Sequence, residues 1–232
     1  MSETRRGFHE ELERVELEIL GLGDLAERAV GRAVDALVTG DADLATAVVA
    51  GDDEIDERYL QIEQRILRLF ALQTPVASDL RLLSAMLHID PHLERIGDQA
   101  VNIAKTYLAV HDLPTSPIVV SHIQEMAGIA RSMIRTALEA LRRRDRHACL
   151  RLPEMDDPVD RLNLGMYQEV ALLAPDPDRL RWGLRMLLVA RQLERVGDNA
   201  VDIGEQVWFL LTGEFREFTD ASHPVIIGPD TD

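Results

Sequence analysis

The chain has 232 residues, of which 46% are hydrophobic, 28% are charged and only 4% are aromatic, and its formal net charge is −16. This composition excludes disorder as the default and favours a packed aliphatic core, which suits helices better than strands. The negative charge argues against direct binding to nucleic acid or to an anionic membrane surface, and it favours cations or basic protein surfaces as partners.

The first half of the chain predicts three helices. Apolar residues recur at helical spacing over residues 8–39, 44–72 and about 78–110, so each stretch can bury one face. Gly40 is a typical stop for the first helix, Gly51 is expected to soften the second helix, and Pro75 ends it before the third begins. The short connections predict that neighbouring helices run antiparallel.

The second half repeats this arrangement after a proline-containing linker. Helical spacing returns over residues 123–141, 156–174 and 180–211, and strand-like alternation is absent from the sequence. We therefore predict an all-α fold of two tandem, pseudo-repeated three-helix bundles. The predicted bounds are residues 1–110 for the first bundle, 111–121 for the linker, 122–215 for the second bundle and 216–232 for a C-terminal tail.

An internal duplication underlies this pattern. Residues 93–104 recur as residues 193–204 with eight of the twelve positions identical, and the other four positions exchange near neighbours. The first two helices of each half match at an offset of 104, which aligns Asp52 with Asp156. So long a match exceeds what helical composition alone produces, and it predicts two structurally equivalent units.

Acidic side chains form stripes on the repeated helices. Two acids four residues apart lie on one helical face and repel each other weakly. Where two such pairs face each other across a helix contact, the repulsion favours a neutralising cation, and oxygen-only ligands suit Mg²⁺, Mn²⁺, Ca²⁺ or iron. We therefore predict divalent or iron-type metal ions at surface carboxylate clusters. The candidate ligands are Glu94, Asp98, Asn102, Asp52 and Asp56 in the first copy, and Glu194, Asp198, Asp202, Asp156 and Asp160 in the second.

Two other interpretations of the acids stay open. An isolated acid pair is usually a solvated helix face. Glu94 and Asp98 lie opposite the predicted apolar side, which includes Leu93 and Ile96, and both a solvated face and a shallow metal site require this position. A ferritin-like di-iron oxidase would need Glu-x-x-His pairs, but none of the seven histidines has a glutamate three residues before it. The enzymatic interpretation is therefore disfavoured.

Four other residues have structural interpretations. Gly97 and Gly197 lie inside the repeated helices, where each costs ~1 kcal/mol relative to alanine. This cost indicates the close approach of a neighbouring helix or of a ligand, and we favour tight packing against a helix. His88 and His92 have no counterparts in the second half, and we interpret both as structural.

The sequence also bears on the compartment. The single cysteine, Cys149, allows no disulfide within the chain and is expected to be a small buried hydrophobe, which favours a reducing compartment. The charged N-terminus is not typical of a signal peptide, and no run of eighteen apolar residues occurs. We therefore expect a cytoplasmic protein without membrane insertion.

These residues resemble the PhoU family of phosphate-transport regulators. The resemblance rests on the duplicated stretch, on Pro75-x-x-Ser78-Asp79-Leu80-Arg81 before its first copy, and on the segment from Gly51 to Asp56. It covers nearly the whole chain and implies two similar three-helix bundles in a cytoplasmic, non-enzymatic protein that is usually a homodimer. It further implies a negative regulator of the phosphate-starvation response, which links the ATPase of the phosphate ABC transporter to a sensor histidine kinase.

The resemblance also implies metal sites. Family members carry Glu/Asp-x-x-x-Asp motifs that bind metal clusters on the bundle surface. These motifs correspond here to Glu94 with Asp98 and to Glu194 with Asp198, and less directly to Asp52 with Asp56 and to Asp156 with Asp160. Pro158 favours a helix that begins after Asp156, which weakens the second site. A helical scaffold whose acids bind no functional metal therefore remains the alternative to a metal-binding adaptor.

Overall fold

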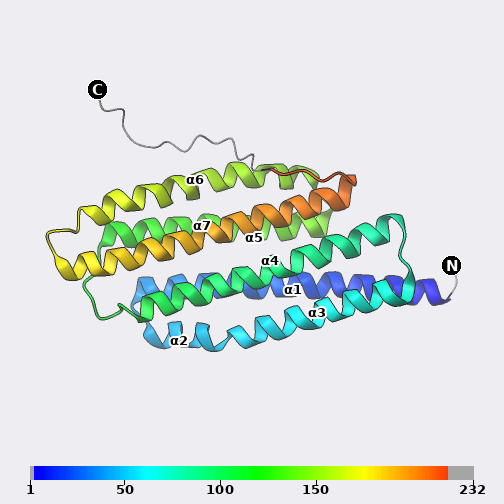
Figure 1. Ribbon diagram of the computed structural model, residues 1–232, viewed down its shortest axis with the longest axis horizontal. Helices are drawn as coiled ribbons and strands as arrows, with labels where there is room; N and C mark the ends of the chain where they lie inside the picture. Colours follow the sequence, from blue (N-terminus) through cyan, green and yellow to red (C-terminus); the bar gives the residue numbers. More distant parts are fainter. Residues whose placement is uncertain (1–2, 219–232) are drawn as a thin grey trace, which may run out of the picture.

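The computed structural model describes residues 3–218, and within this range the chain forms seven helices and no strand. The helices are α1 (Glu3–Thr39), α2 (Ala42–Ala50), α3 (Asp52–Gln73), α4 (Ala77–Leu108), α5 (Pro117–Arg143), α6 (Arg146–Ala171) and α7 (Pro177–Thr212). Figure 1 shows α1–α4 as one group of rods and α5–α7 as a second group beside it. The predicted fold of two tandem three-helix bundles is confirmed, with the middle helix of the first bundle divided into α2 and α3.

The core is aliphatic and follows the predicted helical faces. The apolar side of α4 is fully or almost fully buried, as its spacing indicates, through Ile89, Leu93, Ile96, Ala100, Ile103 and Tyr107. Residues 92–101 and 192–201 have the same degree of burial at every position. The two repeated helices also pack along each other, since α4 and α7 form a major contact between the bundles. The duplicated sequence thus builds two equivalent environments that meet in the middle of the molecule.

The predicted helix over residues 44–72 is not one helix, because it is interrupted at Gly51, where the sequence indicated only a softening. The backbone N–H of Gly51 donates to the carbonyls of Ala47 and Val48, which closes α2, and α3 begins at Asp52. Asp52 therefore lies in the first turn of a helix, where the unpaired backbone N–H groups favour negative charge.

The second repeat has no such break, and two predicted boundaries there are also wrong. Helix α6 begins at Arg146, ten residues before the predicted start, because the side chain of Asp145 accepts hydrogen bonds from the backbone N–H groups of His147 and Ala148. Pro158 lies inside this helix, so the expectation that Asp156 precedes the helix is wrong. The predicted linker is also too long, since α5 already begins at Pro117.

Asp176 caps the N-terminus of α7. Its carboxylate accepts hydrogen bonds from the backbone N–H groups of Asp178 and Arg179 at 3.1 Å each. We expect Asp176→Ala to lower the free energy of unfolding by about 1 kcal/mol, because two N–H groups lose their acceptor. Urea denaturation measures this change. Asp178→Ala removes a neighbouring charge without removing the cap, and a loss as large for this control as for Asp176→Ala would contradict the prediction.

The chain turns back after α7. Gly213 adopts a left-handed conformation at the end of the helix. The backbone N–H of Phe218 then donates to Glu205 Oε1 at 2.7 Å, and the Phe218 ring meets Trp208 edge-on. The part of the predicted tail that precedes residue 219 thus packs on α7, and residues 219–232 lie outside the described range. In residues 3–218, none of the helices combines the length and the apolar character needed to cross a bilayer.

Candidate functional site

In the first copy, the predicted acids of α3 and α4 lie close enough to act on each other electrostatically across the contact between the two helices. Burial raises the pKa of Asp52 above its usual range, and the charges of Asp56 and Asp98 raise it further. Burial likewise raises the pKa of Glu94, followed by the charges of Asp98 and Asp56. Each pair from one helix therefore repels the pair from the other, which is the arrangement that the spacing predicts. A cation between the helices would relieve this repulsion.

The second copy builds the equivalent cluster across α6 and α7, but deeper in the protein. Asp156 is buried, and its burial together with the charges of Asp160 and Asp198 raises its pKa to about 8. Burial also raises the pKa of Asp198, and Asp160 adds to this effect. The carboxyl of Asp156 is thus mostly protonated at neutral pH in the metal-free protein, and a metal ion would have to displace that proton.

Two glycines allow the helices to approach closely at these clusters. A Cβ atom at Gly97 would lie 2.8 Å from Ile55 Cδ1 on α3, and a Cβ atom at Gly197 would lie 2.2 Å from Asp156 Oδ1 on α6. The expectation of tight packing is therefore confirmed at both positions. In the second copy, the close neighbour is itself one of the candidate ligands, so Gly197 sets where the Asp156 carboxylate can lie.

Unpartnered oxygens occur at equivalent positions of the two clusters. Asp52 Oδ1 and Asp156 Oδ1 are buried, and neither has a hydrogen-bond partner within the protein. An unsatisfied buried oxygen costs free energy. Its presence at the same position in both repeats fits a positively charged ligand bound separately in each repeat. Within residues 3–218, however, no three or more His, Cys, Asp or Glu side chains are already arranged so that they could hold a metal ion. A bound metal ion would therefore require these side chains to change position.

The clusters differ in how firmly their glutamates are held. In the second copy, Arg191 forms an ion pair with Glu194, whereas the equivalent position of the first copy is Pro91, which cannot form one. Burial still raises the pKa of Glu194, and Arg191 opposes this rise. The second cluster is therefore partly neutralised by the protein itself, and the first is the better candidate for a cation.

Asn102 and Asp202 also border the other repeat, and the charge of Asp202 adds to the effect of burial in raising the pKa of Asp198 in its own cluster. A cleft of about 430 Å³ lies between α4 and α7. It is lined by Arg95, Asp98, Gln99 and Asn102 from α4, and by Gln192, Arg195, Asp198, Asn199 and Asp202 from α7. Most of these residues are equivalent members of the duplicated stretch. Asp98 and Asp198 thus border both their own cluster and the shared cleft.

His92 connects the two repeats, which sequence reasoning did not predict. Its Nδ1 atom lies 2.9 Å from Asn199 Oδ1 and 3.4 Å from Asp202 Oδ2. Burial raises the pKa of Asp202, while His92 and Arg95 lower it. The interpretation of His92 as structural agrees with this position, but its partners lie in the other half of the chain, where no local sequence signal indicates them.

Asp90 is the other acid that sequence reasoning missed. It is fully buried, and neither of its carboxylate oxygens has a hydrogen-bond partner. Burial raises its pKa to about 8, and the charges of Glu63 and Glu94 contribute. A signal was present, since Asp90 lies four residues before Glu94 on the same helical line. The second copy has Ala190 at this position, so Asp90 does not appear in the repeated pattern.

Comparison with known proteins adds an independent result. The family model described as "PhoU domain" matches residues 19–106 and 123–207. The chain is 34% identical over 212 residues to the phosphate-specific transport system accessory protein PhoU homolog of Caulobacter vibrioides, covering 91% of this chain and 92% of that protein. The crystal structure of PhoU from Pseudomonas aeruginosa is similar with a TM-score of 0.84 and 33% identity, covering 89% of this chain and 100% of that chain. A structure of the regulatory protein PhoU from Streptococcus pneumoniae has a TM-score of 0.83 and 27% identity, over 90% of this chain and 99% of that one.

Proposed function

The chain belongs to the PhoU family, and from this premise we propose that it represses the phosphate-starvation response when phosphate is abundant. Family membership rests on the match to both repeats and on the relatives named as accessory proteins of phosphate transport. The chain accordingly has a role in the regulation of phosphate transport and is not an enzyme. The proposal concerns the direction of that regulation, the metal ions and the partners.

The acid clusters are proposed to hold metal ions of the divalent or iron type. The supporting observation is that Asp52 and Asp156, aligned by the duplication, each keep a buried unpartnered oxygen beside other acids. Glu94 and Asp98 would complete the first site with Asp52 and Asp56, and the equivalent acids of α6 and α7 would complete the second. A bound cation supplies positive charge there, which removes the mutual repulsion of the carboxylates and joins neighbouring helices.

The proposed partners are a second copy of the chain, the ATPase of the phosphate ABC transporter and a sensor histidine kinase, and the proposed compartment is the cytoplasm. The names of the relatives support an association with the transporter. The net charge of −16 supports partners that present basic surfaces. In this proposal, the protein acts as an adaptor whose shape depends on the metal ions that hold α3 to α4 and α6 to α7.

Deletion of the gene tests the proposed regulation. In cells of the source organism grown with abundant phosphate, deletion is expected to switch on phosphate-starvation genes, and the wild-type gene is expected to restore repression. Co-purification with tagged protein should recover the transporter ATPase or the kinase from the same cells. Unchanged expression after deletion would contradict the proposed repression. A protein that restores repression but recovers neither partner would contradict the proposed adaptor role.

A further inference from the structure

Positive charge is concentrated on one short part of the chain, the end of α5 and the beginning of α6. Residues 131–151 contain seven arginines and two acids, although the whole chain has a net charge of −16. The equivalent segment of the first repeat, residues 27–47, contains two arginines and four acids. Both segments build the end of one helix, a short connection and the start of the next, so this part of the fold does not require the arginines.

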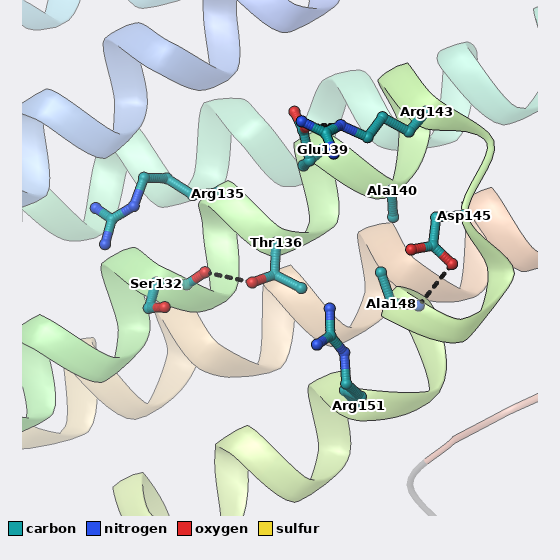
Figure 2. Close-up of a pocket in the computed structure, with 9 residues that line it drawn as sticks. All are labelled: Ser132, Arg135, Thr136, Glu139, Ala140, Arg143, Asp145, Ala148 and Arg151. Carbon is teal, nitrogen blue, oxygen red and sulfur yellow. Dashed lines mark hydrogen bonds and ion pairs between the residues drawn. The ribbon is translucent and has the colours of Figure 1, made fainter.

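The arginines of the second repeat border a cleft between α5 and α6, which we call the arginine cleft. It has a volume of about 430 Å³, and Arg135, Arg143 and Arg151 are among the residues that line it. The aligned positions of the first repeat are Gly31, Thr39 and Ala47. Figure 2 shows the Arg151 side chain extending from α6 toward Thr136 on α5, and Arg143 lying beside Glu139 at the end of α5.

The two acids of the arginine cleft are already engaged. Glu139 accepts a hydrogen bond from Arg142 Nε at 2.8 Å and forms an ion pair with Arg143. Asp145 accepts from the backbone N–H groups of Ala148 and His147, which lower its pKa. Because these carboxylates have their own donors, they offset the guanidinium groups of the cleft only in part.

The arginines of the cleft also keep binding capacity. Arg135 pairs with Glu27 of α1 through one nitrogen at 2.5 Å, and each guanidinium offers five N–H donors. Arg143 and Arg151 are exposed, so a ligand can reach them without opening the bundle. Guanidinium groups that two helices carry at the border of one cleft suit an anion with several oxygens and more than one negative charge.

We propose that the arginine cleft binds a small soluble anion that carries phosphate groups. A phosphate group carries a charge of about −1.5 to −2 at neutral pH and has three acceptor oxygens. It therefore matches several guanidinium groups better than one carboxylate group would. The site is separate from the acid clusters, which lie on the contacts of α3 with α4 and of α6 with α7. The inference therefore does not depend on the proposed metal ions.

Calorimetric titration of the metal-free full-length protein with pyrophosphate tests this site. We expect saturable binding of one pyrophosphate per chain in the wild type. The variant Arg143→Gln/Arg151→Gln should bind at least about tenfold more weakly, because each charge-assisted hydrogen bond contributes roughly that factor. The matched control is Arg28→Gln/Arg32→Gln, which removes two exposed arginines from the equivalent face of the first repeat. This control makes the net charge more negative by the same amount as the double variant in the cleft. Its affinity for pyrophosphate is expected to stay within about twofold of the wild type.

Several results would overturn the proposal. These are the absence of saturable binding in the wild type, an equal loss in the control, or full affinity in the double variant. Anionic lipid headgroups carry the same chemistry, so vesicles of phosphatidylglycerol form a separate arm, and binding to vesicles without binding of pyrophosphate would overturn the assignment to a small soluble ligand. Circular dichroism shows whether the double variant keeps its helical content. If it does not, Arg151→Glu replaces it, and this single reversal of charge is expected to weaken pyrophosphate binding by a similar factor.

Discussion

Asp90→Ala is expected to stabilise the metal-free protein at pH 8, and to stabilise it far less at pH 5. Asp90 is fully buried without a hydrogen-bond partner, and its pKa is raised to about 8. A carboxyl whose pKa is higher in the folded state contributes most below its unfolded pKa of about 4, and that contribution is lost as the pH rises to the folded pKa. The advantage of the alanine variant should therefore grow by about 3 kcal/mol between pH 5 and pH 8.

The duplication supplies a matched control for this prediction. The second repeat carries Ala190 where the first carries Asp90, so alanine is already accommodated at this position of the fold. The reverse change, Ala190→Asp, should destabilise the protein with the same pH dependence, because Ala190 is fully buried. Urea denaturation with chelator at pH 5 and pH 8 measures both variants. If the stability difference between Asp90→Ala and wild type were the same at the two pH values, the assigned burial of a titrating carboxyl would be wrong.

Gly197→Ala is expected to lower the free energy of unfolding by about 1–3 kcal/mol, the usual cost of adding a methyl group to a packed interior. The new Cβ atom would lie 2.2 Å from Asp156 Oδ1, and Met133 Cε lies 3.6 Å from the same point. Asp156 is buried inside α6, so its carboxylate can give way only if the side chain turns or the helix moves. The same change would displace a candidate ligand of the second cluster.

A control for Gly197→Ala is available in α5. A Cβ atom at Gly128 would meet nothing within 4 Å, so Gly128→Ala should raise stability by up to about 1 kcal/mol through helix propensity alone. Thermal and urea denaturation of the two variants measure the contrast. A stabilised Gly197→Ala protein would contradict the prediction, because it would show that the Asp156 carboxylate is not held against Gly197.

The fold could be predicted from the sequence because the relevant signals are local or repeated. The helical spacing of apolar residues placed Ile89, Leu93 and Ile96 on the buried side of α4, and the structure confirms this. Helix boundaries were less certain, because they depend on individual backbone hydrogen bonds. The backbone N–H of Gly51 closes α2, and the Asp145 carboxylate starts α6 before two internal prolines.

The candidate site could be predicted where its partners lie on helices that the duplication aligns. The i and i+4 spacing predicted that the acids of α3 and α4 act on each other, and in the structure burial and the charges of Asp56 and Asp98 raise the pKa of Asp52 and of Glu94. The contacts of His92 could not be predicted, because its partners Asn199 and Asp202 lie more than one hundred residues away. Whether the acids bind metal stays a prediction, since charge repulsion favours a cation but does not select it.

Metal content of the purified protein tests the central claim most directly. Protein prepared without chelator should carry metal ions when measured by elemental analysis and native mass spectrometry. Glu94→Ala/Asp98→Ala should lose the ions of the first cluster, and Glu194→Ala/Asp198→Ala should lose those of the second, while each variant keeps its helical content. Metal-free wild-type protein that takes up no Mg²⁺, Mn²⁺ or iron, or a metal content unchanged in both variants, would contradict the claim that the duplicated acids form metal sites.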